Sequence, residues 1–97
     1  MMKVGDYIIA RGDRSGVFAG TLKKDNGKEV TLKNVRRLWY WSGAASLSQL
    51  AEEGVKKPNT CKFPVEVSEI VLTDVIEKLA VSKIAKKNIA EVPVWKQ

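Results

Sequence analysis

The chain has 97 residues, of which 44% are hydrophobic and 29% are charged, and this composition predicts a single globular domain over residues 1–97. Cys61 is the only cysteine and there is no histidine. An intramolecular disulfide, a Cys/His zinc site and nucleophile–histidine catalysis are therefore excluded. The carboxylates are scattered along the chain, so we expect no enzymatic activity, no catalytic residue, no metal and no cofactor.

The sequence contains no run near the roughly 18 apolar residues that cross a bilayer. Its first residues also lack the apolar segment of a signal peptide. From these features we expect a cytoplasmic protein without a membrane partner.

The net charge of +6 is concentrated in the first half of the chain. Residues 1–43 hold nine basic and four acidic side chains, including all four arginines, whereas residues 44–97 hold eight and seven. A first half of the chain with this excess of basic side chains would attract polyanions. Alternatively, a moderate net charge simply keeps a protein soluble. Both interpretations stay open.

Three β-strands are predicted in the first third of the chain, at residues 7–11, 17–23 and 29–33. Glycine, Asp and Ser at residues 12–16 are typical of a turn. The Asn26-Gly27 pair predicts a type I′ hairpin, because both central residues of that turn need positive φ.

Residues 35–43 combine two of the three tryptophans, a tyrosine and two arginines. We expect a strand that ends at Ser42-Gly43. Alternation along a strand would put Arg36, Leu38 and Tyr40 on one face and Val35, Arg37, Trp39 and Trp41 on the other. Since both faces carry aromatic residues, both should be covered, one by the core and the other by a helix, a subunit or a ligand.

Two helices are predicted in the second half. The first covers residues 44–54, with a capping box of Ser46 and Gln49 and with Gly54 as its C′ residue. A start at Ser42 or Gly43 is the alternative, and it would place a helix N-terminus, a potential anion site, directly after the aromatic strand. The second covers residues 83–91 after Ser82, with a core stripe of Ala85, Ile89 and Val92 supported by Ile84.

Between the helices we expect a strand at 61–67, a turn at 68–69 and a long strand at 70–79. One more β-pairing is possible in the tail at 94–97. The predicted fold class is α+β, a small antiparallel sheet or half-open β-barrel of about five or six strands with two short helices.

Several segments resemble a known family. They are residues 34–54, Lys57-Pro58, Cys61-Lys62-Phe63 and the tail at 92–96. Together they are similar to the small bacteriophage-encoded proteins of the DUF6948 family, a domain of unknown function, from Gly16 to the end of the chain. The resemblance implies a phage origin and an intracellular setting, and it brings no agreed activity and no catalytic residues.

The aromatic and arginine-rich segment is the candidate ligand site, with the residues Arg36, Arg37, Trp39, Tyr40, Trp41, Ser42 and Gly43. The indole rings would stack on a base and the guanidinium groups would hold phosphate. The simpler interpretation of Trp39 and Trp41 is packing in the core or in an interface. Glu66 or Glu52 would then neutralise Arg37.

Three functions fit this site. The first is a non-catalytic phage accessory protein, acting inside the infected bacterium as a homo-oligomer, that binds a nucleotide-type signal of host defence, a nucleic acid or a host protein. The second is a structural or assembly protein whose aromatic strand is only a subunit interface. The third is a DNA- or RNA-binding β-barrel, whose affinity would fall steeply with salt.

Overall fold

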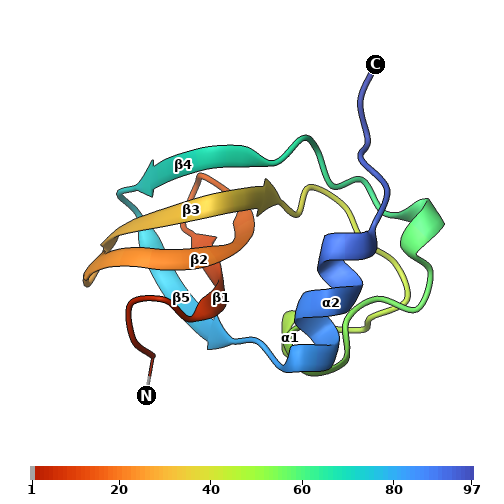
Figure 1. Cartoon of the computed structure of the whole chain (residues 1–97), viewed down its shortest axis with the longest axis horizontal. Coiled ribbons are helices and arrows are strands. Elements are labelled where there is room, and N and C mark those ends of the chain that lie inside the picture. Colours follow the sequence, from red (N-terminus) through yellow and green to blue (C-terminus); the bar gives the residue numbers. More distant parts are fainter. Residues whose placement is uncertain (1) are drawn as a thin grey trace.

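The computed structural model describes residues 2–97 and is an α+β fold, as predicted. One sheet contains all five strands in the order β4-β3-β2-β1-β5, and every neighbouring pair is antiparallel (Figure 1). The elements in chain order are β1 (Tyr7–Gly12), β2 (Val17–Asn26), β3 (Glu29–Arg37), α1 (Leu47–Glu53), the 3-10 turn η1 (Pro58–Thr60), β4 (Val67–Leu72), β5 (Val75–Ala80) and α2 (Lys83–Glu91).

The sheet curls into a half-open barrel. Its two edge strands, β4 and β5, are joined by only Thr73 and Asp74, so the edges must approach each other at that end. The β2–β3 hairpin also reaches β5, since the Val75 amide donates to the Lys28 carbonyl at 3.0 Å.

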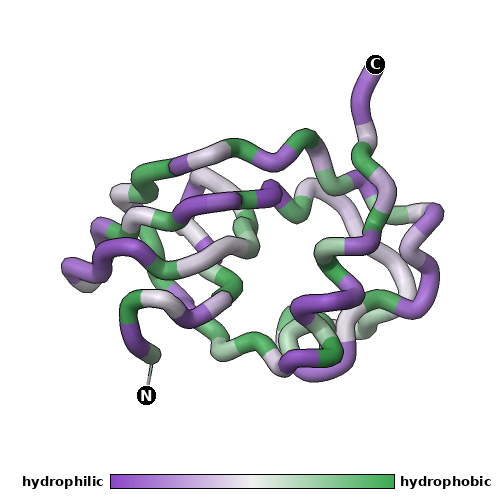
Figure 2. The backbone as a smooth tube through the Cα atoms, viewed as in Figure 1, coloured by the Kyte–Doolittle hydropathy of each residue, from purple (hydrophilic) through white to green (hydrophobic). Residues whose placement is uncertain are grey.

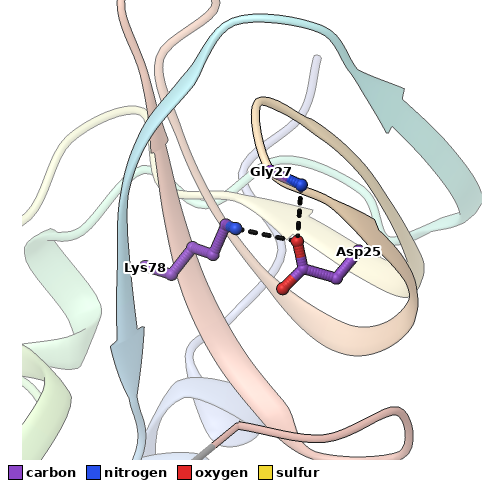
Figure 3. Close-up of polar contacts among 3 residues, drawn as sticks. All are labelled: Asp25, Gly27 and Lys78. Carbon is purple, nitrogen blue, oxygen red and sulfur yellow. Dashed lines mark hydrogen bonds and ion pairs between the residues drawn. The ribbon is translucent and has the colours of Figure 1, made fainter.

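A side-chain contact supports this curl. Lys78 of β5 forms an ion pair with Asp25 near the end of β2 at 2.8 Å, and the same carboxylate accepts from the Gly27 amide (Figure 3). The tip of this hairpin is hydrophilic (Figure 2). Both ionic side chains are partly exposed, so the pair contributes little energy and mainly fixes the position of the hairpin tip.

The strong bend of the sheet has a local cause in β3. Asn34 has φ +52°, and the β2–β3 register shifts opposite it, which is the pattern of a β-bulge. Gly20 lies at this shift, and a Cβ there would be 3.1 Å from the Lys33 carbonyl oxygen. The absence of a side chain at Gly20 therefore lets the two strands bend closely together.

Apolar residues are buried on both sides of the sheet. The barrel core inside the curl consists of Ile8, Ala10, Phe18, Leu22, Val30, Leu32, Val35, Leu72 and Val75. The helix-side core lies between the outer face of the sheet, α1, α2 and their loops, and consists of Ile9, Ala19, Leu38, Leu50, Ala51, Val55, Cys61, Phe63, Ile89 and Val92. Alternation along β1 and β2 supplies both cores.

Two strand predictions were wrong. Residues 70–79 do not form one strand, because the chain turns at Thr73 and Asp74 between β4 and β5. Residues 61–67 form only two isolated bridges, at Lys62 and Phe63, before β4 begins at Val67 and includes the predicted turn at 68–69.

The predicted hairpin is present, but the prediction that its turn is of type I′ was wrong. Asn26 still pairs with Glu29, so Gly27 and Lys28 are the central residues, and only Gly27 has a positive φ, +80°.

The helix predictions were closer to the structure. Ser46 caps α1 by accepting from the Gln49 amide, although the helix begins at Leu47 rather than at residue 44. The bounds of α2 and its cap at Ser82 are as predicted. Ile84 was wrongly placed in the core stripe, since it is 74% exposed. Within the described residues, no helix has the length and apolar character needed to cross a membrane.

Candidate functional site

The aromatic segment leaves the sheet earlier than predicted. Strand β3 ends at Arg37, and the Leu38 amide makes a last bond to the Val17 carbonyl at 2.8 Å, where β2 begins. Beyond this point β2 offers no further partner, so the predicted strand through Trp41 was wrong. Tyr40 instead pairs with Lys62 as an isolated bridge.

Arg36 is buried against the C-terminal end of α2, with only 5% of its surface exposed. Nη1 donates to the carbonyl oxygens of Ile89 and Val92 at 2.9 and 2.8 Å, and Nη2 donates to the Phe63 carbonyl at 2.9 Å. The last carbonyls of a helix lack internal partners and carry partial negative charge, so a guanidinium group satisfies them well. Burial lowers the pKa of Arg36, and nearby Tyr7 and Glu66 oppose this shift.

These bonds correct the prediction for Arg36. Its guanidinium group is inside the protein and is used to join β3 to α2 and to the segment after η1. Arg36 is therefore a structural residue, and the prediction that it binds a phosphate group of a ligand is withdrawn.

Arg37 lies on the other face of β3 and reaches the surface. Its Nη1 donates to the Ser15 carbonyl at 2.8 Å, and Cζ lies 4.4 Å from the centroid of the Phe18 ring. The anticipated acidic partners, Glu66 and Glu52, make no ion pair with it within residues 2–97. The guanidinium group is thus held in place by a carbonyl and a ring, with N–H groups left for a ligand.

A cleft of about 440 Å³ opens beside Arg37. It is lined by residues 15–17 of the β1–β2 loop, by Arg37 and Leu38, and by Trp39 and Trp41. Trp39 is 57% exposed, whereas Trp41 is half-buried against the helix-side core. Three of the predicted ligand residues, Arg37, Trp39 and Trp41, therefore meet at one open cavity.

The loop that borders the cleft is held by Asp74, the residue that separates β4 from β5. Its carboxylate accepts from the amides of Arg14 and Ser15 at 2.7 and 2.9 Å and from the Ser15 hydroxyl at 2.7 Å. These hydrogen bonds lower the pKa of Asp74. The carboxylate thus fixes the loop whose Ser15 carbonyl positions Arg37.

An aromatic platform, consisting of Trp39, Tyr40, Trp95 and Lys62, lies next to the cleft. The rings of Trp39 and Trp95 stack with centroids 5.2 Å apart and planes 8° apart. Lys62 Nζ lies 5.4, 5.8 and 5.5 Å from the ring centroids of Trp39, Tyr40 and Trp95, respectively. Tyr40, a predicted ligand residue, belongs to this platform and does not line the cleft.

Sequence reasoning did not include Trp95 and Lys62 in the site. The predicted β-pairing of the tail was the available signal, because the bridge between Phe63 and Val94 and the bond from the Trp95 amide to the Phe63 carbonyl bring Trp95 beside Trp39.

Ser42 and Gly43 do not line the cleft. The Ser42 hydroxyl bonds to the Thr60 hydroxyl, and the Gly43 carbonyl accepts from the Lys56 amide at 3.1 Å. Gly43 has φ +86°, and a Cβ there would lie 2.6 Å from two backbone nitrogens. Both residues anchor the segment after the platform to the 55–60 loop.

The described residues contain no group of three or more acidic or cysteine side chains that could hold a metal ion. The cleft and the platform present aromatic rings, the cations of Arg37 and Lys62, and residues 15–17 of the β1–β2 loop. The fold and surface of the protein define a class: a small α+β protein with a half-open β-barrel and an open cleft lined by arginine and tryptophan.

Residues 5–89 match the family described as Domain of unknown function (DUF6948), and the chain belongs to this family. No curated protein and no solved structure matches the chain significantly. The match confirms the resemblance, but its extent differs from our prediction. It begins at Gly5 rather than Gly16 and ends at Ile89, so the tail with Trp95 lies outside it.

Proposed function

We propose that this protein is a non-catalytic binding protein whose cleft takes a nucleotide-type ligand, with a flat base and a phosphate group. The observation that carries the proposal is the presence of Arg37 and the exposed Trp39 on the same open cleft. Stacking of a base on an aromatic side chain is worth about 1–3 kcal/mol. A guanidinium group supplies charge-assisted hydrogen bonds to phosphate.

The Arg37 side chain is already held in one position in the protein without a ligand, and this preorganisation supports the proposal. Its bond to the Ser15 carbonyl and its contact with Phe18 restrict the side chain. A ligand would therefore lose less free energy to the ordering of this side chain than it would on a free surface arginine.

The resemblance to small phage-encoded proteins suggests the setting. We propose that the protein acts in the cytoplasm of an infected bacterium, as a phage accessory protein that evades host defence. The ligand would then be a nucleotide signal of host defence or a nucleic acid.

A titration with mononucleotides tests this proposal. Thymidine monophosphate and adenosine monophosphate should quench tryptophan fluorescence and raise the melting temperature, while the matching nucleosides should do so much more weakly. Loss of charge-assisted hydrogen bonds in Arg37→Ala should reduce nucleotide affinity by at least about tenfold. Lys23→Ala is the charge-matched control, because Lys23 pairs with Glu69 and does not line the cleft. The proposal fails if neither mononucleotides nor oligonucleotides change either signal.

A second candidate is an interface between copies of the chain, either in a structural phage protein or in a binding protein that works as a homo-oligomer. It is favoured by the exposure of Tyr40, Val94 and Trp95, at 48%, 52% and 40%, close to the exposed Trp39. Large exposed apolar patches often mark protein–protein contacts. Light scattering should then give the mass of an oligomer that Trp95→Ala dissociates, and a monomer at all concentrations would exclude it. A host protein would be the other protein partner of such a surface.

A further inference from the structure

The cleft and the aromatic platform share one residue, Trp39, which lines the cleft and stacks on Trp95. From this continuity we infer that the ligand is a single-stranded nucleic acid whose successive bases occupy the cleft and then the platform. This inference rests on the proposed function and specifies the ligand class for the same site.

The platform offers stacking surface beyond the cleft. Trp39 and Trp95 cover one face of each other's ring, and they remain 57% and 40% exposed. The Tyr40 ring is also about half exposed, and Lys62 Nζ lies less than 6 Å from the centroids of all three rings. More than one base can therefore find an aromatic partner on this surface.

The cations of this surface are available to phosphate. The ion pairs within residues 2–97 are Arg11–Glu77, Lys23–Glu69 and Lys78–Asp25, and none of these residues lines the cleft or belongs to the platform. Neither Arg37 nor Lys62 forms an ion pair with an acidic side chain of the described residues, and Lys96 follows Trp95 directly in the sequence. A phosphodiester chain that passes over the rings would meet these cations.

This combination favours a single strand over other polyanions. Proteins that bind single strands combine cations along the backbone with rings on which unpaired bases stack. In a duplex the base faces are covered by neighbouring base pairs, so the rings would gain no contact. The site is an open surface rather than an enclosed pocket, which suits a chain that extends beyond one nucleotide.

Tryptophan fluorescence reports on this surface directly, because Trp39, Trp41 and Trp95 are the only tryptophans. Titrations would use thymidine monophosphate and oligothymidylates of about two, four and eight nucleotides. We expect the affinity to rise at least tenfold from the monophosphate to the tetranucleotide. It should fall with salt, with a log–log slope of about −0.7 for each phosphate contacted.

Two variants separate the platform from the cleft. Trp95→Ala and Lys62→Ala should each weaken binding of the tetranucleotide several-fold and leave monophosphate binding within about twofold, because a single nucleotide occupies the cleft alone. Lys83→Ala is the matched control for Lys62→Ala, since it removes an equal charge from the exposed start of α2. It should behave as the unmodified protein.

The outcomes distinguish this inference from the proposed function. If the monophosphate binds as tightly as the longest oligomer, the cleft is a mononucleotide site and the single-strand inference is wrong, while the proposed function holds. If a duplex binds as tightly as the single strand, or if Trp95→Ala leaves tetranucleotide binding unchanged, the inference is also wrong. Absence of binding by every nucleotide and oligomer would reject both.

Discussion

Arg36 and Arg37 are neighbours in the sequence and have opposite roles. Successive side chains of a strand point to opposite faces, so Arg36 enters the space between the sheet and α2 while Arg37 reaches the cleft. Arg36 binds three backbone carbonyls in two segments that are distant in sequence, and Arg37 has one carbonyl partner near the surface.

Replacement of each arginine should separate these roles. In Arg36→Ala the Val92 carbonyl would lose its donor, and the carbonyls of Ile89 and Phe63 would keep only the amides of Val92 and Trp95. A lost hydrogen bond to a charged group costs about 1.5–3 kcal/mol, and a buried polar group left unpaired costs about 1–3 kcal/mol. We expect the free energy of unfolding to fall by about 3 kcal/mol or more, as measured by urea denaturation. Arg37→Ala should change it by less than about 1 kcal/mol. Equal effects of the two substitutions would contradict the assignment.

Tyr7 gives a prediction for high pH. Burial raises the pKa of the Tyr7 phenol from 10.0 to about 12, although the nearby Arg36 opposes the shift. Below pH 10 both the folded and the unfolded phenol are protonated, and the stability is complete. As the pH rises from 10 to 12 only the unfolded state releases the proton, so the free energy of unfolding should decrease.

The difference between the unmodified protein and Tyr7→Phe isolates this effect from the titration of lysines. The phenylalanine variant should lose about 2 kcal/mol less between pH 9 and 12. Parallel pH profiles of the two proteins would show that the phenol titrates normally.

The sequence predicted part of this arrangement. Alternation correctly separated Arg36 from Arg37, because period two depends only on the strand itself. It did not show which of the two would be buried, since that depends on α2, whose last carbonyls come from residues more than 50 positions later in the chain.

Among the elements, the β1–β2 loop depends on Asp74. The carboxylate accepts two amide hydrogen bonds and one hydroxyl hydrogen bond from Arg14 and Ser15. In Asp74→Ala the amides of these two residues should exchange hydrogen faster, and nucleotide affinity should fall because Ser15 no longer holds Arg37 in place. Asp13→Ala, in the same loop, is the control.

The pH dependence of this loop follows from the lowered pKa of Asp74. The stabilisation is complete above the ordinary pKa of 3.8 and is lost as the pH falls through the lower value in the folded protein. Slow exchange at Arg14 and Ser15 that persists in Asp74→Ala would contradict the role of the carboxylate.

The two helices are joined by Asn88 of α2. Its side chain accepts from the Val55 amide at 2.8 Å and donates to the Val55 carbonyl at 2.9 Å, so it pairs with both polar groups of one buried residue. Gly54 makes room for this contact, because a Cβ there would collide with the Asn88 side chain.

Asn88→Ala should lower the free energy of unfolding by about 2 kcal/mol, because it leaves the backbone of Val55 without partners. Thermal unfolding would measure the effect. Lys87→Ala, at the preceding exposed position of the same helix, should be nearly neutral. A neutral Asn88→Ala would mean that the bonds between Asn88 and Val55 add no net stability.

Helices and strands were predicted accurately where the signals for their ends are local in the sequence, and wrongly where an end depends on a distant contact. Helix α2 was predicted with its bounds because Ser82, the apolar stripe and Pro93 are all local signals. Residues 70–79 read as one strand because their β-branched composition continues through the turn. The break depends on the contact of Asp74 with Arg14 and Ser15, about 60 positions away.

At the scale of the molecule, the curled sheet and the helical layer together create the site. Strand β3 ends where β2 begins, so residues 38–41 leave the sheet and cross its end beside the β1–β2 loop. The C-terminal tail then runs past Phe63, and its end projects beyond α2 (Figure 1). This path brings Trp95 onto Trp39.

The fold class could be predicted because composition, alternation and helix caps are local properties of the chain. The cleft could be predicted only in part. Arg37, Trp39 and Trp41 were in the candidate set, but the loop at 15–17 and the tail reach them through contacts between distant segments.

The most direct test of the central claim is a nitrogen–proton NMR titration that observes the three indole N–H signals of the protein. On addition of thymidine monophosphate, the signals of Trp39 and Trp41 should shift in a saturable way, and the shifts should disappear in Arg37→Ala. Unchanged indole signals at saturating nucleotide, or equal shifts in Arg37→Ala, would contradict a nucleotide site in the cleft.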